Sequence, residues 1–535
     1  MASARRTAGK LLDRLAFAHT LVGDPYKARA YKNAAWPIRS LEGDLAELLA
    51  TGALKGKRGF GKGVMGVLQA AVDGVEPVGL AELEAKVPPG LFEVARIRGL
   101  GATKVRQLYE SLAITDLSEL EYACRENRLL ALDGFGKGTQ TKVLAEVQRL
   151  MSERGKFRRD HARALADALV AHLRPRCERV MVVGEMRRGC ELVETLELLV
   201  VGDAELPPLP DGAPTVLLHR SNGADWGTLA VQHTGTAAHL DALGPLPVAS
   251  SEAEVYRKLG FLVPAPEQRE SSDLVRLGHA PVELVRREDL QGSLHNHTTY
   301  SDGADSLETM RDAALQAGLA YFAVTEHSQT ANYARGLEPH RLADQVDEVR
   351  RLNEQGHGCM LLAGVESDIL REGELDYTPE ELAQLDLVVA SIHNRFGLKG
   401  EAMTRRMANA AANPWVSIMG HPTGRLLLGR PPADYDVEAM LDNAAENGCA
   451  VELNASPARL DLNEEHLRMA SERGLLVSIA ADAHSARELD YLGYGVSIAR
   501  RAGLRPDQVL NCMGLNELLR WLERRKQRAL ASPAP

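Results

Sequence analysis

Cysteine is scarce in this sequence, and none of its six cysteines belongs to a CxxC pair. Their scatter argues against a disulfide framework and against a cysteine zinc site, so a reducing, cytoplasmic location is expected. Long apolar runs are missing as well, and no transmembrane span is predicted. Asp13 and Arg14 interrupt the mildly apolar N-terminal stretch, which favours an amphipathic helix over a signal peptide.

An excess of positive charge is also lacking. The formal net charge is -10, with 63 Lys and Arg against 73 Asp and Glu. This balance excludes a polyanion binder held by bulk charge, so any contact with nucleic acid must come from a local basic face or from backbone amides. The 535 residues exceed what one hydrophobic core supports, and they predict roughly two to four domains.

Residues 1 to about 155 are expected to be helical throughout, and a glycine-hydrophobic-glycine turn occurs there three times. Each of these glycine turns opens an apolar-periodic stretch with a lysine in or near its first helical turn. Glycine lets the backbone bend sharply and approach a ligand, and free amides at a helix start can hold a phosphate. The key residues are Gly59, Gly61, Lys62 and Gly63 in the first turn, Gly99, Gly101 and Lys104 in the second, and Gly134, Gly136 and Lys137 in the third.

Three copies of this unit predict helix-hairpin-helix motifs that bind a nucleic-acid backbone without reading its sequence. The alternative for each copy is a plain connection between two helices. One copy alone would be weak evidence, and the repetition is what favours DNA binding.

The rest of the chain alternates between predicted strands and helices. The words ERVMVVGEMRRG (178–189) and LELLVVGDAE (196–205) indicate two strands of an α/β unit, whereas residues 206–290 give no clear fold signal. From residue 291 onward, six apolar stretches each follow a helical stretch, which predicts a parallel α/β barrel. These stretches are YFAVTEH, MLLAGVESDIL, LDLVVASIH, VSIMGH, AVELNAS and LVSIAADAH.

Histidines and carboxylates stand at or just after the carboxyl ends of the predicted strands, where α/β barrels have their catalytic residues. In the HxH and DxH motifs, the first and third side chains lie on one face of a strand, because side chains alternate with a period of two. Imidazole and carboxylate together suit Mn²⁺, Zn²⁺ or Fe²⁺. Any one histidine would more simply be a core or surface residue, but the set predicts a metal site. The predicted ligands are His295, His297, Asp302, His327, Glu366, His393, His421, Asp482 and His484.

These spacings are similar to those of the PHP (polymerase and histidinol phosphatase) domain. The words EVYRKLG (254–260), GHPTGRLL (420–427) and ELNASPARLDL (452–462) resemble bacterial family X DNA polymerases. That family combines helix-hairpin-helix domains, a polymerase palm and a C-terminal PHP domain in this order. The resemblance implies a helical DNA-binding domain with the first hairpin (1–90), a helical fingers-like region with the other two (91–155), a reduced, degenerate α/β nucleotidyltransferase-like palm with a linker (156–290), and a distorted, TIM-like PHP phosphoesterase barrel (291–535).

The resemblance also implies three metal ions, with Mn²⁺ expected and Zn²⁺ or Fe²⁺ as alternatives. Such ions activate water for attack on phosphorus. One would be held by His295, His297, Glu366 and Asp482, a second by Asp302, His327 and His484, and a third by His393 and His421 with Glu366 bridging.

Two arginines that closely follow ligand positions, Arg395 and Arg425, are candidate clamps for phosphate oxygens, with surface salt bridges as the alternative. One departure from the family is Glu326, which precedes His327 where an aspartate is usual. We expect no effect on metal ligation.

The polymerase part departs further from the family pattern. Nucleotidyl transfer in this family needs three aspartates that hold two metals. Their positions fall on Thr195, Glu197 and, by counting, Leu217. Both aromatics of the nucleotide-binding segment are replaced, by Gln232 and His233. A relocated set of carboxylates is not evident, so polymerase activity is expected to be lost.

The combined prediction is a DNA-repair enzyme, a metal-dependent 3′-to-5′ exonuclease or DNA-end-processing phosphoesterase. Its partner would be gapped, nicked or 3′-ended DNA, bound through the backbone by a monomer. Three alternatives stay open: a gap-filling polymerase with PHP proofreading, a small-molecule phosphatase of the histidinol phosphatase type, and a non-enzymatic DNA-end binder. The missing aspartates speak against the first, the glycine turns against the second and the complete ligand set against the third.

Overall fold

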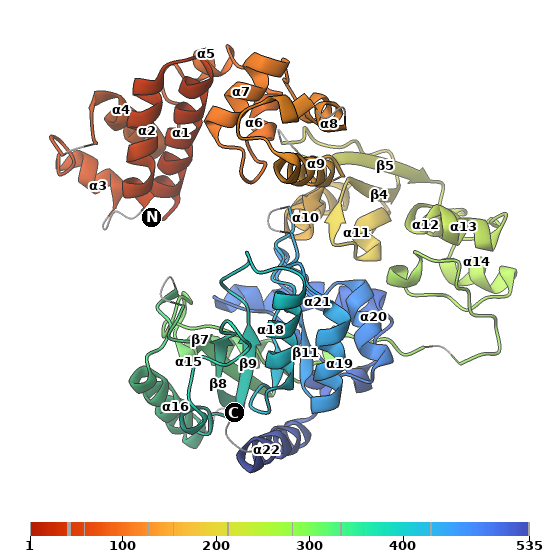
Figure 1. Cartoon of the computed structure of the whole chain (residues 1–535). Helices are drawn as coiled ribbons and strands as arrows, with labels where there is room; N and C mark the ends of the chain where they lie inside the picture. Colours follow the sequence, from red (N-terminus) through yellow and green to blue (C-terminus); the bar gives the residue numbers. More distant parts are fainter. Residues whose placement is uncertain are drawn as a thin grey trace. The chain divides into compact units, whose positions relative to one another are not determined.

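The structure is a computed structural model, and the chain divides into two compact units, Met1–Arg154 and Gly155–Pro535 (Figure 1). No helix among the described residues is long and apolar enough to cross a membrane. The described residues are 2–39, 44–57, 59–125, 128–152, 155–210, 213–280, 282–331, 334–356, 358–428 and 431–532.

The N-terminal unit is helical wherever it is described, as predicted. One core surrounds Leu12 and Leu68, and a second surrounds Val105 and Val143. The first helix packs in both cores, because Leu12 lies in one and Ala18 in the other. The helices are α1 (Ala2–Leu21), α2 (Pro25–Arg39), α3 (Leu45–Ala50), α4 (Lys62–Asp73), α5 (Leu80–Glu84), α6 (Gly90–Val94), α7 (Ala102–Leu112), α8 (Leu117–Arg125), the 3-10 turn η1 (Arg128–Ala131) and α9 (Lys137–Ser152).

The second unit begins with a three-stranded sheet in the order β2-β4-β5. The strands β2 (Arg179–Val183) and β4 (Thr195–Val201) confirm the two predicted strands, and they pair antiparallel, whereas β4 and β5 (Thr215–Ser221) run parallel. Buried side chains of α10 (Arg159–Leu173) and of β4 form the core on one face of this sheet.

The other face is covered by α12 (Trp226–Thr234), whose Trp226 and Ala230 pack with Val183 and Leu199. Residues that gave no fold signal in the sequence thus form ordered helices. The remaining elements of this part are β1 (Phe157–Arg158), α11 (Gly184–Arg188), β3 (Leu192–Val193), α13 (Ala237–Leu243), α14 (Glu252–Leu259) and the 3-10 turns η2 (Pro266–Gln268) and η3 (Arg287–Asp289).

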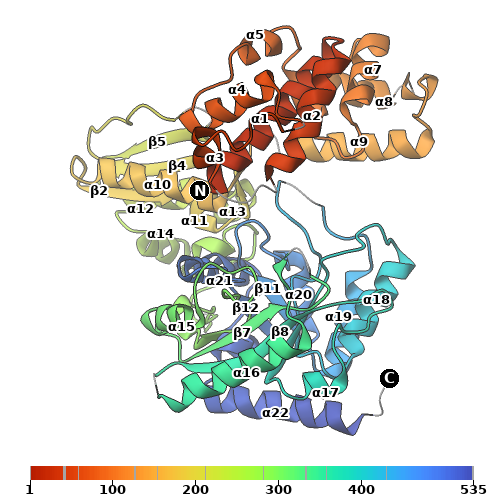
Figure 2. The same ribbon diagram turned by 90° about the vertical axis from the view of Figure 1, so that its left-hand side faces the viewer.

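The C-terminal part is a parallel sheet of seven strands in the order β12-β11-β10-β9-β8-β7-β6, covered by helices (Figure 2). The six predicted strands are all present. The strands are β6 (Gly292–Ser293), β7 (Tyr321–His327), β8 (Met360–Asp368), β9 (Leu387–Ser391), β10 (Ile418–Met419), β11 (Ala450–Asn454) and β12 (Val477–Ala480). The helices are α15 (Leu307–Gln316), α16 (Pro339–Glu354), α17 (Pro379–Leu382), α18 (Glu401–Ala412), α19 (Val437–Asn447), α20 (Glu464–Glu472), α21 (Leu492–Arg501) and α22 (Leu515–Ala531).

The sheet nearly closes into a barrel, because a parallel bridge between Asn296 and Ala483 joins the segments that follow its two edge strands. His297 N donates to Ala483 O at 2.8 Å and Asp482 N donates to His295 O at 3.1 Å. Closure of the barrel therefore places the HxH motif (His295 and His297) beside the DxH motif (Asp482 and His484). The predicted TIM-like class of this part is confirmed, with seven strands in place of eight.

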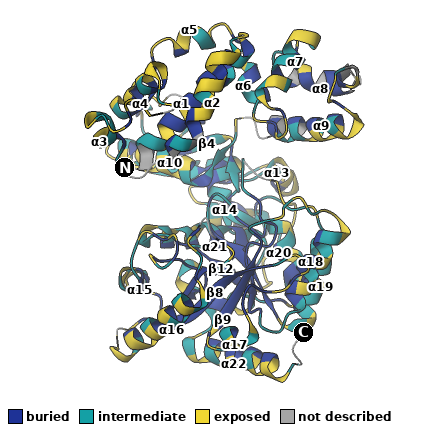
Figure 3. Cartoon of the chain, turned by 60° about the vertical axis from the view of Figure 1, so that its left-hand side comes forward, coloured by how far each residue is buried: buried dark blue, intermediate teal, exposed yellow. Residues whose placement is uncertain are grey.

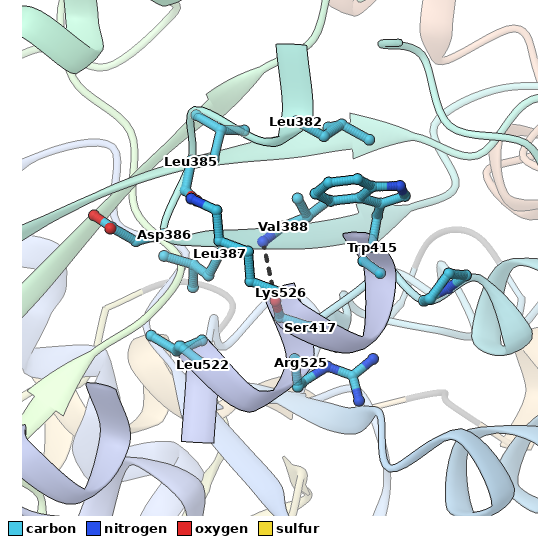
Figure 4. A pocket seen from close by; sticks show the side chains of 12 residues that line it. Leu382, Leu385, Asp386, Leu387, Val388, Trp415, Ser417, Leu522, Arg525 and Lys526 are labelled. Atoms are coloured by element: carbon cyan, nitrogen blue, oxygen red, sulfur yellow. Dashed lines mark hydrogen bonds between the residues drawn. The ribbon is translucent and has the colours of Figure 1, made fainter. Parts of the chain in front are cut away.

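Helix α22 covers the opposite, amino-terminal end of the strands. Leu518 and Leu522 pack with the barrel residues Tyr321, Leu387 and Ile418. Figure 4 shows this contact, with Leu522, Arg525 and Lys526 beside strand β9 and Trp415, and with the hydrogen bond from Val388 N to Ser417 Oγ at 3.2 Å. The strands are the most deeply buried part of the barrel (Figure 3). Because α22 fills this end of the barrel, the functional site is expected at the carboxyl ends of the strands.

Candidate metal centre

The structure brings all of the predicted metal ligands to the carboxyl ends of the strands. Glu366 lies within β8 and His327 ends β7. The other histidines and Asp482 stand in the segments just after β6, β9, β10 and β12, and Asp302 lies in the loop that follows β6. Their potential ligand atoms fall into four overlapping groups, within each of which all atoms lie within 4.8 Å of one another. The groups are His297, Asp302, His327 and His484; His295, His297 and Asp482; His295, Glu366 and His421; and His327, Glu366 and His393.

The Glu366 carboxylate lies at the centre of these groups. It is 1% exposed, and its two oxygens face five imidazoles. The nitrogen–oxygen distances are 2.8 Å to His327, 2.9 Å to His421, 3.2 Å to His393, 3.3 Å to His295 and 3.6 Å to His297. Glu366 therefore lies within reach of each of these five rings.

Two aspartates flank this centre. Asp482 Oδ1 lies 3.2 Å from His297 Nε2 and 3.7 Å from His295 Nε2. Asp302 Oδ1 lies 3.5 Å from His327 Nε2 and 3.4 Å from His484 Nε2. The first two sets that the resemblance implied are thus close together in space.

The third set is arranged differently from the first two. His393 and His421 belong to different groups, but both Nε2 atoms approach the same oxygen, Glu366 Oε1, at 3.2 and 2.9 Å. A cation shared by these two rings would therefore also contact Glu366.

The chemical state of the centre suits a divalent cation. Burial lowers the pKa of the His297 imidazole to about 3, so its ring is neutral. Burial alone would raise the pKa of Glu366, but His393 and His295 hold it well below the ordinary value. Within the described part of the chain, His295 Nε2, both His297 nitrogens and Glu366 Oε2 are buried without a hydrogen-bond partner. Unsatisfied buried groups are costly, and a metal would satisfy these.

Three residues beside the centre were missed by the sequence analysis. His295 Nδ1 lies 2.6 Å from Glu452 Oε2 and His393 Nδ1 lies 2.6 Å from Asp368 Oδ1. Asn454 Nδ2 donates to Asp482 Oδ2 at 2.9 Å. Such partners fix the tautomer and orientation of metal ligands. Asp368 was available in principle, because it follows Glu366 by two residues and so points to the same face of β8.

Asp368→Ala should weaken metal binding by about 10- to 100-fold, because the His393 ring loses the acceptor that orients it. Excess Mn²⁺ should restore most of the activity, since no ligand is removed. The measurement is activity as a function of Mn²⁺ concentration, with the exposed Asp347→Ala on α16 as the matched control. An unchanged Mn²⁺ dependence would show that Asp368 does not position His393.

Glu326 lies outside the four groups. Its side chain accepts from Thr298 N at 2.9 Å and from the hydroxyls of Thr298 and Ser301. Burial raises its pKa to about 7. Glu326 therefore orders the loop that carries Asp302.

The two candidate phosphate clamps differ in their surroundings. Arg395 is exposed, with a φ of 57°, on the segment after β9. Arg425 is 10% exposed, and its guanidinium donates to Glu191 Oε1 at 2.6 Å, to Arg459 O at 3.0 Å and to Leu460 O. Arg425 thus forms a salt bridge with Glu191, which precedes β3.

A third arginine, Arg459, was not considered from the sequence. Its Nε lies 3.7 Å from Asp482 Oδ2. Its Nη1 is buried and has no hydrogen-bond partner within the described part of the chain. A cationic group with a spare donor beside the ligands is suited to a phosphate oxygen.

The glycine turns have a common geometry. Gly59, Gly99 and Gly134 have φ values of 93°, 91° and 80°, a region that L residues rarely adopt. Gly61 and Gly101 then stand at the N-caps of α4 and α7, and Gly136 immediately precedes α9. All of these glycines are exposed, as are Gly63, Lys62 and Lys137, while Lys104 is half-buried with its Nζ 5.2 Å from the centre of the Phe135 ring. The residues at three helix starts are thus exposed.

In the palm, the positions expected for the polymerase aspartates lie close together. Thr195 and Glu197 are on β4, and Leu217 is the register partner of Glu197 on β5. Leu217 is 43% exposed. The potential metal ligands grouped around Glu197 are two histidines, with no aspartate among the described residues.

The barrel defines the C-terminal part as a PHP domain, and the model of that family matches residues 293–456. The DNA polymerase/3'-5' exonuclease PolX of Bacillus subtilis (strain 168) is 31% identical over 564 residues, which cover 96% of this chain and 98% of that protein. This chain therefore belongs to the PolX family.

Other relatives match less than half of this chain. A probable phosphatase of Thermoanaerobacter sp. (strain X514) is 28% identical over 40% of this chain and 93% of its own length. A probable phosphatase of Shewanella sp. (strain MR-4) is 31% identical over 45% of this chain and 94% of its own length. The crystal structure of histidinol phosphate phosphatase from Lactococcus lactis, complexed with zinc, L-histidinol and phosphate, covers 40% of this chain and 94% of that one, at 17% identity and a TM-score of 0.31.

Proposed function

We propose that this chain is a metal-dependent 3′-to-5′ exonuclease that processes DNA ends during repair. The observation that carries the proposal is the convergence of five imidazoles on Glu366, flanked by Asp302 and Asp482. Similarity to the PolX of Bacillus subtilis over 96% of the chain supports DNA as the substrate. The barrel would cut, and the helical unit would hold the DNA.

The ligand sets support up to three divalent ions, with Mn²⁺ as the expected metal. Bound there, such ions would lower the pKa of a water molecule and neutralise the charge that develops on phosphate. The proposed sets are His295, His297, Glu366 and Asp482; Asp302, His327 and His484; and His393 and His421 with Glu366 shared.

The protein's own groups would position the substrate. Arg459, with its spare donor near Asp482, and the exposed Arg395 would bind phosphate oxygens. Asp368 and Glu452 would hold the His393 and His295 rings in one tautomer. The residue ranges 1–90, 91–155, 156–290 and 291–535 are proposed as the DNA-binding domain, the fingers-like region, the degenerate palm with its linker, and the phosphoesterase.

A comparison of substrates tests the proposal. The purified protein in Mn²⁺ should shorten a 3′-recessed or gapped DNA strand, should lose this activity in chelator, and should turn over a phosphomonoester metabolite far more slowly. The second candidate, a small-molecule phosphatase, is favoured by the similarity of part of this chain to probable phosphatases. Preference for the phosphomonoester with no loss of DNA nucleotides would decide for that candidate.

The glycine turns give a prediction about DNA binding. Gly61→Val and Gly136→Val should each weaken binding to gapped DNA by about tenfold, because loss of roughly one backbone–phosphate contact costs about 1.4 kcal/mol. An added Cβ meets nothing within 4 Å at either position, so the fold should survive. Fluorescence anisotropy at several salt concentrations measures the affinity, which should fall with salt.

The matched control is Gly66→Val on the exposed side of α4, which also meets nothing within 4 Å. This variant should bind DNA like the parent. Parent-like affinity in both Gly61→Val and Gly136→Val would mean that the turns are only structural.

A further inference from the structure

A second cluster of metal-ligating side chains lies in the palm, away from the PHP centre. Glu197 of β4, His219 of β5 and His233 of α12 each offer one ligand atom, and these atoms all lie within 4.8 Å of one another. His219 Nε2 is 2.8 Å from Glu197 Oε2. The two imidazole rings stack, with centroids 3.5 Å apart and planes inclined by 16°.

The fold brings these three side chains together, and one imidazole must turn out of the stack for both rings to face one ion. Glu197 pairs with Leu217 across the parallel β4–β5 register, so His219, two residues along β5, points to the same face. Helix α12 crosses that face, where its Trp226 packs with Leu199, and it brings His233 over the strands. Three separate elements with a packed core behind them therefore hold the trio.

Gly184 also keeps space free around the Glu197 carboxylate. A Cβ at Gly184, which has a φ of 65°, would lie 2.5 Å from Glu197 Oε1, so only glycine leaves the carboxylate where it is. Within the described part of the chain, Glu197 forms no ion pair with a lysine or arginine. Glu197 and His219 are each 21% exposed, so solvent and small ions can reach them.

The donor set has a clear chemical preference. Two imidazoles and one carboxylate are a common three-ligand set for Zn²⁺, with the fourth tetrahedral position left for water. Such a set binds Zn²⁺ more tightly than Mn²⁺, and it suits Mg²⁺ poorly because Mg²⁺ takes oxygen ligands. The set is unlike the all-aspartate pattern expected of a family X palm.

We propose that Glu197, His219 and His233 form a mononuclear site for a divalent transition metal, with Zn²⁺ as the expected occupant. The site is separate from the PHP centre and independent of the proposed exonuclease activity. It binds one ion between β4, β5 and α12 and so links the two strands to the helix. The alternative is a histidine pair that stacks and accepts or donates hydrogen bonds without any metal.

Metal analysis of the full chain tests the proposal. The metal-free protein is equilibrated with Zn²⁺ and an excess of Mg²⁺, freed of loosely bound ions and analysed. His219→Ala with His233→Ala should contain about one Zn²⁺ fewer than the parent, because a three-ligand site does not survive loss of two ligands. Exonuclease activity in Mn²⁺ should be unchanged, which separates this result from any failure of the PHP centre.

Glu197→Gln is a second test variant, which should fold like the parent because glutamine has the same size as glutamate. Competition with a chromogenic chelator should show at least about a tenfold loss of Zn²⁺ affinity for one site, since the anionic ligand is lost. The control is His161→Ala on α10, whose side chain is 68% exposed, and it should retain all of the zinc. Equal zinc content in the parent and the double variant, or unchanged competition by Glu197→Gln, would overturn the proposal.

Discussion

Replacing His295 and His297 together by alanine should abolish nuclease activity while DNA binding survives. These two side chains contribute to three of the four ligand groups, and His297 belongs to two of them. Their loss would remove the two imidazoles nearest to Asp482, at 3.2 and 3.7 Å, and two of the five imidazoles that face Glu366. Bound metals supply several kcal/mol of transition-state stabilisation, so the rate should fall by at least about 10⁴-fold.

A 3′-labelled, gapped DNA substrate in Mn²⁺ measures the rate, and fluorescence anisotropy measures DNA binding by the same protein. The control is His340→Ala, because His340 is exposed on α16 and belongs to none of the ligand groups. Excess Mn²⁺ should not rescue the double variant, in contrast to Asp368→Ala. Cleavage at the parent rate would show that another site cuts DNA.

The barrel and its candidate ligands could be predicted from the sequence because the signals are local. A buried parallel strand is a short apolar run, and the polar residue that follows it, as in VSIMGH, stands at the carboxyl end. Glu452 and Asp368 were missed because they contact metal-ligand side chains and are not themselves predicted ligands. Their role depends on His295 and His393, which are distant in sequence.

Arg425 and the palm cluster likewise depend on partners that are distant in sequence. Arg425 closely follows the ligand position His421, which suggested a phosphate clamp, but its partner Glu191 is 234 residues away. Glu191, Glu194 and Glu197 are spaced three residues apart, so a strand does not point all three to one face. A mixed site of one glutamate and two histidines from three elements has no spacing that a single sequence reveals.

The other large effect concerns polymerisation, and the expected result is that the wild-type protein does not extend a primer. Nucleotidyl transfer needs two metals held by bridging carboxylates. Thr195 is neutral, and Leu217, directly beside Glu197 on the next strand, offers no ligand. Glu197 is left as the one carboxylate among these three positions, and it contacts His219 at 2.8 Å.

The loss of this electrostatic stabilisation should lower the rate by at least about 10⁴-fold relative to an intact palm. Asp225 is no substitute, because its carboxylate accepts from Ser221 Oγ at 2.6 Å and from Asn222 N at 3.2 Å. The aromatics that would stack on a nucleotide are also gone at Gln232 and His233, and His233 stacks on His219 instead.

Primer extension on gapped DNA with all four dNTPs, in Mg²⁺ and in Mn²⁺, is the measurement. A His295→Ala, His297→Ala background removes nuclease activity that would hide slow synthesis, and Glu197→Ala in that background is the matched variant. Both proteins should leave the primer unextended, because neither has a carboxylate at Thr195 or Leu217. Template-directed addition of even one nucleotide that disappears in Glu197→Ala would show that the palm is active. The metal ion proposed for Glu197, His219 and His233 would then have to be assigned to nucleotidyl transfer.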